Sequence, residues 1–133
     1  MRYLLDTNII SYFLRKQFPN IAVHLKKIPF SSIQIPTIAI AEIEYGCRKC
    51  QDYGKTMSVY QQFFNCFDAL PFTETAAIAY GQIRAELETK GEIIGANDLL
   101  IAAIALAEDC ILVTHNVKEF QKVAGLKIED WTE

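Results

Sequence analysis

The sequence lacks any hydrophobic run long enough to cross a membrane, and its first residues lack the pattern of a secretion signal. The early apolar segment Tyr3–Leu5 is interrupted at once by Asp6. Excess positive charge is also missing: the formal net charge is −3, which gives no broad electrostatic attraction for nucleic acid. A concentrated acidic site whose metal ions are not counted can produce that sign. We therefore expect a cytoplasmic protein with no membrane partner.

Cysteine is scarce, with four residues in 133. Cys47 and Cys50 have the spacing of a CxxC pair, but no second pair accompanies them, and they fall near the end of a predicted helix. A structural zinc site needs more ligands than this, and a redox pair needs a more suitable position. We therefore expect reduced thiols that contribute to packing.

No internal repeat, low-complexity tract or linker divides the chain. Of its residues, 51% are hydrophobic and 22% are charged, which is typical of a globular protein. A chain of 133 residues can bury an ordinary core without disulfides or metals to support it. We therefore expect one domain over residues 1–133.

Short apolar segments alternate along the chain with longer segments of helical periodicity. This alternation predicts an α/β fold in which helical crossovers join parallel strands. Two helices fall between the third and fourth strands, so one of them must cross obliquely. The expected strands are residues 3–5, 30–35, 68–71, 110–114 and 126–128, and the expected helices are residues 9–14, 21–28, 38–49 with Thr37 as N-cap, 52–66, 74–90, 98–107 and 117–123.

Four polar side chains are predicted at the carboxyl-terminal edge of this sheet, where open α/β sheets bind ligands. Asp6 follows the first strand directly, and Asn116 follows the fourth. Glu42 lies about 8 Å from the start of the helix that leaves the second strand. Asp98 opens the helix that leads into the fourth strand, and every side chain from 99 to 107 is apolar. Each acid alone has an ordinary explanation, such as the helix dipole for Asp98, but their joint placement favours a site.

Three carboxylates gathered at one edge repel one another, and their pKa values rise unless a cation offsets the charge. Hard oxygen ligands of this kind suit Mg²⁺ or Mn²⁺ better than zinc. A centre of this type can activate water and stabilise the charge that develops on a phosphodiester. The sequence therefore predicts a metal-dependent acidic site.

Five motifs support a resemblance that covers essentially the whole chain. They are LLDTNIIS at residues 4–11, IAEIEYG at 40–46, IGANDLLIAAIAL at 94–106, LVTHNVKEF at 112–120 and GLKIEDW at 125–131. In order and spacing the chain resembles the PIN-domain family, and specifically the VapC-type ribonuclease toxins of bacterial type II toxin–antitoxin pairs. The resemblance implies a three-layer α/β/α fold with a parallel sheet of four to five strands. It also implies Mg²⁺-dependent endonucleolytic cleavage of RNA, commonly structured RNA such as tRNA, by a metal-activated water.

The resemblance also implies roles for individual residues. By position, Asp6 and Asp98 correspond to the main metal ligands, and Glu42 completes the acidic cluster directly or through water. Asn116 falls where many relatives have a further aspartate. Its amide can coordinate or orient water but carries no charge, which argues against a firmly held second metal.

Further polar residues lie beside these positions in the sequence. Thr7, Asn8 and Thr114 are expected to orient ligands or water. Arg84 could reach a phosphate, although a solvated helix face is the default for it. The family further implies an RNA substrate, a small antitoxin that covers the acidic groove, and a homodimer.

Two other functions remain open from the sequence. A PIN-like module that binds RNA or a partner but cuts weakly or not at all is supported only by Asn116. A phosphoacceptor or phosphatase with a nucleophilic Asp6 is less favoured, because no second acid lies next to Asp6 and the third strand ends at Leu70 and Pro71 rather than at an aspartate.

Overall fold

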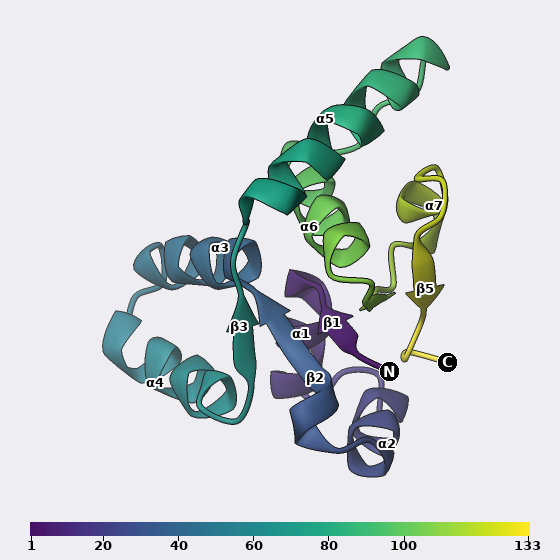
Figure 1. Ribbon diagram of the computed structural model, residues 1–133. Coiled ribbons are helices and arrows are strands. Elements are labelled where there is room, and N and C mark those ends of the chain that lie inside the picture. Colours follow the sequence, from purple (N-terminus) through teal and green to yellow (C-terminus); the bar gives the residue numbers. More distant parts are fainter.

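The computed structural model describes all 133 residues (Figure 1). No helix combines the length and the hydropathy needed to cross a bilayer. The strands are β1 (Tyr3–Leu5), β2 (Ile33–Pro36), β3 (Asp68–Leu70), β4 (Ile111–Val113) and β5 (Lys127–Glu129); the helices are α1 (Thr7–Leu14), α2 (Asn20–Lys27), the 3₁₀-helix η1 (Phe30–Ser32), α3 (Thr37–Arg48), α4 (Tyr53–Phe64), α5 (Glu74–Thr89), α6 (Ala96–Ala107) and α7 (Val117–Phe120).

The five strands form one sheet in the order β3-β2-β1-β4-β5, and every neighbouring pair is parallel. The central strand β1 pairs through Tyr3 with Ile33 on one side and with Ile111 on the other. Parallel pairing brings the carboxyl ends of all the strands to the same edge. The predicted α/β class and the five-stranded parallel sheet are confirmed.

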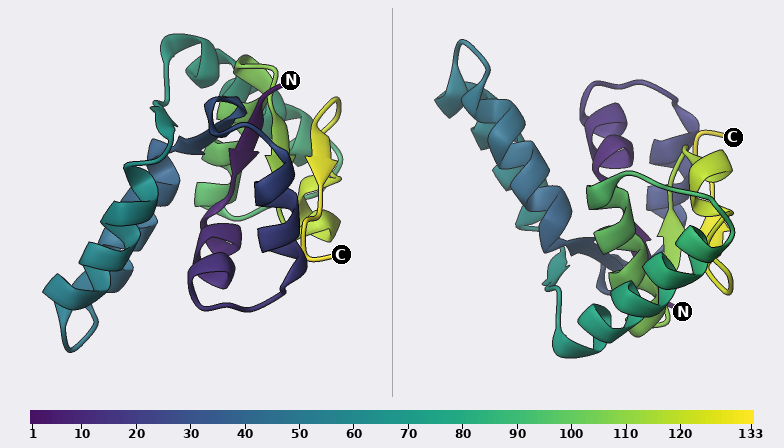
Figure 2. Two further views of the ribbon diagram at one scale, coloured as in Figure 1. Left: turned by 90° about the horizontal axis from the view of Figure 1, so that it is seen from below. Right: turned by 90° about the horizontal axis from the view of Figure 1, so that it is seen from above.

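The helices cover both faces of this sheet. Successive strand residues point to opposite faces: Leu4 and Leu112 pack with α5 and α6, whereas Leu5 and Val113 pack with α1 to α4. The result is the expected three-layer α/β/α arrangement. Figure 2 shows α3 and α4 as a helix pair that projects from the body of the protein.

Two helices, α5 and α6, connect β3 to β4, and they pack against each other as an outer and an inner layer on one face of the sheet. α6 is the inner helix, with six buried side chains, and it turns into β4 through a hydrogen bond from the Cys110 N–H to the Ala105 carbonyl (2.9 Å). α5 packs on the outside of α6 and buries only Ala76, Ile83 and Leu87. A helix that is apolar on all sides belongs inside, and an amphipathic one belongs outside.

Several predicted boundaries were wrong by a few residues. Residues 30–32 form a 3₁₀ turn, closed by the Ser32 N–H on the Pro29 carbonyl (2.9 Å), so β2 begins only at Ile33. Thr37 is the first residue of α3 and makes no capping hydrogen bond. α6 begins at Ala96, so Asp98 lies within its first turn.

The four cysteines are free thiols. Cys47 and Cys110 are buried, as expected of packing residues, whereas Cys50 and Cys66 are exposed. The packing interpretation was therefore right for two of them and wrong for the two that lie just beyond the ends of α3 and α4.

Candidate active site

Asp6 is held at the point where β1 becomes α1. Its backbone N–H donates to the Val113 carbonyl (3.1 Å), which continues the sheet, and its Oδ1 accepts the Ile9 N–H (2.9 Å), which caps the helix. The residue is only 5% exposed. A strand end and a helix start therefore fix this carboxylate against two rigid elements.

Burial gives Asp6 an unusual proton affinity. Burial raises the pKa of Asp6, and the negative charges of Asp98 and Glu42 act in the same direction, so that this pKa lies at about 6 instead of 3.8. Hydrogen bonds from the Thr114 hydroxyl and the Ile9 N–H oppose this rise in part. Because the charges of Asp98 and Glu42 both raise the pKa of Asp6, the three predicted carboxylates lie close enough in the structure to repel one another.

Glu42 is oriented by donors from two other helices. The Thr7 hydroxyl of α1 donates to its Oε1 (2.5 Å), and the Asn97 Nδ2 of α6 donates to its Oε2 (3.2 Å). Thr7 thus lies where the sequence placed it, beside the acidic group. Asn97 was missed, although it stands next to Asp98 in the same motif.

If the site cleaves RNA as the resemblance implies, we expect Asn97→Ala to lower the rate by about 10–100-fold, because it frees one oxygen of Glu42 from its fixed orientation. Asn97 is exposed, so the melting temperature should change little. The matched control is Asn65→Ala, which removes an exposed amide from the end of α4. Equal cleavage by the two variants would show that Glu42 does not depend on Asn97.

Asp98 lies in the first turn of α6 and is half-buried. Burial raises the pKa of its carboxyl, and the charges of Glu42 and Glu119 raise it further. Glu119 lies on α7 and is bound by Lys122 (2.6 Å). This fourth acid was not predicted, although it follows Asn116 by three residues and so lies near it on a helical face.

Asn116 itself is exposed and sits at the N-cap position of α7, but its side chain makes no capping hydrogen bond. Its backbone N–H donates to the Thr114 hydroxyl (2.9 Å). Thr114 is fully buried and also hydrogen-bonds Asp6. Thr114 therefore connects the end of β4 to the acidic site, and the extra acid near this edge comes from Glu119.

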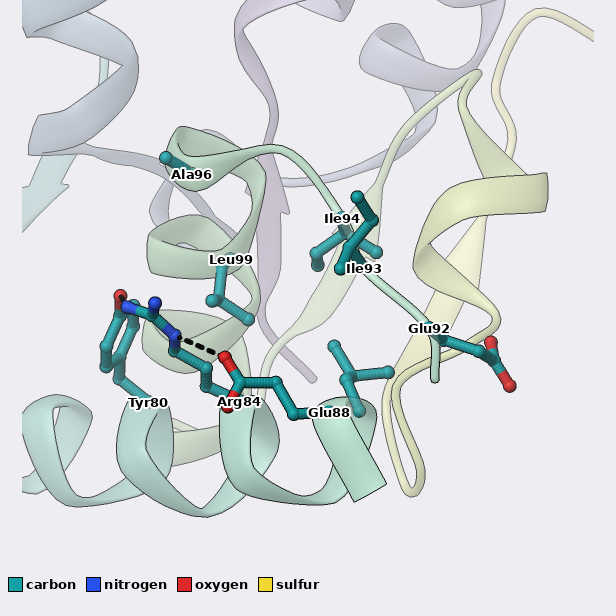
Figure 3. Close-up of a pocket in the computed structure, with 9 residues that line it drawn as sticks. Tyr80, Arg84, Glu88, Glu92, Ile93, Ile94, Ala96 and Leu99 are labelled. Atoms are coloured by element: carbon teal, nitrogen blue, oxygen red, sulfur yellow. Dashed lines mark hydrogen bonds and ion pairs between the residues drawn. The ribbon is translucent and has the colours of Figure 1, made fainter. Parts of the chain in front are cut away.

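Two of the candidate residues take no part in these contacts. Asn8 is exposed in the first turn of α1, and its side chain makes no hydrogen bond in the structure. Arg84 points along α5, where it binds Glu88 (3.1 Å) and the Tyr80 hydroxyl (3.0 Å) beside a pocket of about 270 Å³ (Figure 3). It forms no ion pair with Asp6 or Asp98. The guanidinium is thus engaged by its own helix.

The donor set suits a hard divalent cation. None of the ion pairs in the structure involves Asp6, Glu42 or Asp98, so their mutual repulsion is not offset by any basic side chain. Carboxylate oxygens without cationic partners are typical ligands of Mg²⁺ and Mn²⁺. No three acidic, histidine or cysteine side chains already converge on a single binding point, since Glu42 is turned toward Thr7 and Asn97.

Comparisons with known proteins agree with this geometry. A family model described as the PIN domain matches residues 3–126. Ribonuclease VapC2 of Rickettsia felis is 38% identical, and the tRNA(fMet)-specific endonuclease VapC of Shigella flexneri is 32% identical; the matches cover 98% and 99% of both chains. The crystal structure of DNA-bound VapBC from Salmonella typhimurium is similar with a TM-score of 0.93 and 32% identity, and covers 98% of both chains.

Proposed function

Because the chain belongs to the PIN-domain family and is a VapC-type ribonuclease, we propose that it cuts structured RNA such as tRNA in a Mg²⁺-dependent reaction. The observation that carries this proposal is the buried Asp6, whose pKa responds to both Asp98 and Glu42 while no basic side chain pairs with any of the three. An uncompensated acidic edge on a parallel sheet is suited to a metal ion and a phosphodiester.

Each residue of the site has a role that follows from its contacts. Asp6 and Asp98 would hold the metal, which when bound would polarise a water and offset charge on the phosphodiester. Ile9 and Thr114 fix the position of Asp6 by hydrogen bonds. Glu42, held by its two donors at the edge of the site, would accept a hydrogen bond or a proton from a water bound beside it.

We expect the purified protein to cleave RNA with Mg²⁺ or Mn²⁺ and to lose that activity in EDTA. The physical reason is that close carboxylates cannot approach a polyanionic substrate unless a cation offsets their charge. Cleavage of a tRNA should therefore rise with added metal to a plateau, and excess Mg²⁺ should restore it after EDTA treatment. Undiminished cleavage in EDTA would contradict the proposed chemistry.

The same proposal extends to partners and location. The Rickettsia felis and Salmonella typhimurium relatives were crystallised as VapBC bound to DNA. We extend this to a small antitoxin that covers the acidic groove of the present chain, and to a toxin homodimer acting in the cytoplasm. Glu119, whose charge raises the pKa of the Asp98 carboxyl, supports cleavage over a module that does not cut, because it adds an acid near the edge that has none at position 116.

A further inference from the structure

A narrow groove of about 150 Å³ lies between α1 and the projecting pair of α3 and α4. Glu42 and Thr7 line it, and both belong to the acidic site, so the groove and the site share a wall. Its other side chains are mostly small or hydroxylic. They include Ser11 of α1, Arg15 at the C-cap of α1, Gly46 of α3 and Tyr60 of α4.

One face of α1 forms a polar track along this groove. Thr7, Ser11 and Arg15 recur every four residues, so they lie above one another on the same side of the helix. The track extends about 12 Å from Thr7 to Arg15. Midway along it, the Ser11 hydroxyl lies 3.0 Å from the Tyr60 hydroxyl of α4. The track thus leads away from the acidic site and ends at a guanidinium.

Arg15 is the one arginine of the protein whose side chain has no partner. Arg48 binds Glu44, Arg84 binds Glu88, and Arg2 binds Gln34. Arg15 is exposed and makes no side-chain hydrogen bond or ion pair. An unpaired guanidinium retains all its donors for a planar or tetrahedral anion, and a phosphate accepts two of them at once.

Gly46 forms part of the opposite wall and leaves it open. A methyl group added at its Cα would meet no other atom within 4 Å. The groove can therefore be filled at this position by a larger side chain without displacing the backbone. Since Gly46 lies within α3, such a replacement also raises the helix propensity.

We propose that this groove binds the RNA strand beside the scissile bond, with the Arg15 guanidinium on a backbone phosphate and the α1 hydroxyls on the sugar-phosphate chain. The inference rests on the proposed nuclease function and names how that site holds its substrate. A line of hydroxyls that ends in a free guanidinium suits a sugar-phosphate chain better than an apolar peptide segment. Contacts to the backbone position the strand and carry no sequence preference.

The test measures RNA binding in a protein that cuts only slowly. In the Asp98→Asn background at one fixed Mg²⁺ concentration, which offsets the remaining carboxylates, fluorescence anisotropy with a labelled tRNA gives Kd at several salt concentrations. Arg15→Gln should weaken binding about tenfold and lower the slope of log K against log salt by about 1, because one phosphate contact is lost. Arg48→Gln removes the same charge from outside the groove. We expect its Kd for tRNA and its salt slope to equal those of the Asp98→Asn protein.

A second pair of variants fills space instead of removing charge. Gly46→Leu should weaken tRNA binding and raise KM for cleavage in the otherwise wild-type protein, while its melting temperature stays the same or rises. Gly81→Leu is the matched control, because Gly81 also lies within a helix with open space at its Cα but on α5, away from the groove.

The outcomes separate the inference from the function on which it rests. If wild-type protein cleaves tRNA while Arg15→Gln and Gly46→Leu bind it as their controls do, the groove assignment is wrong and the nuclease function stands. If the variants still bind RNA but no longer bind a co-expressed antitoxin, the groove binds the antitoxin and not RNA, and the assignment is also wrong. If wild-type protein neither binds nor cleaves RNA, both proposals fail.

Discussion

Asp98→Asn should lower the rate of RNA cleavage by at least about 10²–10³-fold, which is the usual loss when a single charge-stabilising group is removed from a catalytic site. The variant keeps the shape of the side chain but removes one of the carboxylates that act on one another at the sheet edge. Because Asp98 is only half-buried and caps no backbone group, the fold should be retained.

Asp109→Asn is the matched control for this experiment. Asp109 is exposed, has a positive φ of 52°, and is bound only by Lys127 at the surface. Asparagine tolerates that backbone conformation, so the variant loses the same charge without strain. Single-turnover cleavage of a tRNA by the two variants and the wild type gives the comparison. A loss below tenfold for Asp98→Asn would contradict the assignment of Asp98 as a metal ligand.

Asp6→Asn should abolish cleavage and, at the same time, stabilise the metal-free protein at neutral pH. The folded-state pKa of Asp6, about 6, lies above its ordinary value of 3.8, so the folded protein binds the proton more tightly. The stability that Asp6 contributes is therefore present at low pH and is lost as the pH rises through this range. At pH 7.5 the buried charge costs about 3 kcal/mol of unfolding free energy, by the conversion of 1.36 kcal/mol per pKa unit.

The measurement is urea unfolding of wild type and Asp6→Asn in EDTA at several pH values. Asparagine caps a helix as well as aspartate does, so the hydrogen bond to the Ile9 N–H has a substitute. The advantage of the variant should be small near pH 4 and grow toward about 3 kcal/mol at pH 7.5. An advantage that does not change with pH, or a variant less stable at pH 7.5, would refute the burial of a charged Asp6.

The architecture was predictable because it depends on local patterns. Tyr3–Leu5 reads as a buried strand and 99–107 as a buried helix from side-chain type alone, and the parallel order then places Asp6 and Asp98 at one edge. The same reasoning placed the start of the second strand three residues too early, at Phe30, although Ser31 and Ser32 are of a residue type that is common in turns.

The details of the site were less predictable because they depend on contacts between distant segments. The hydrogen bond between Glu42 and Asn97 joins residues 55 positions apart, and no local sequence pattern predicts a contact over that separation. Glu119 was missed because the direction of a four-residue helix is fixed by its packing, here through the buried Phe120, and four residues are too few for a helical period to predict it. Arg84, by contrast, lies on the outer helix α5 as an exposed residue, as was expected by default from the sequence.

The central claim is that the carboxylates at the sheet edge cut RNA, and expression in cells tests it most directly. Wild-type protein and Asp98→Ala are induced in parallel, and new RNA 5′ ends are mapped across all transcripts. The account predicts growth arrest and a small set of new ends, concentrated in structured RNA, with the wild type alone. New ends that are equal in both strains, or absent from the wild type, would contradict it.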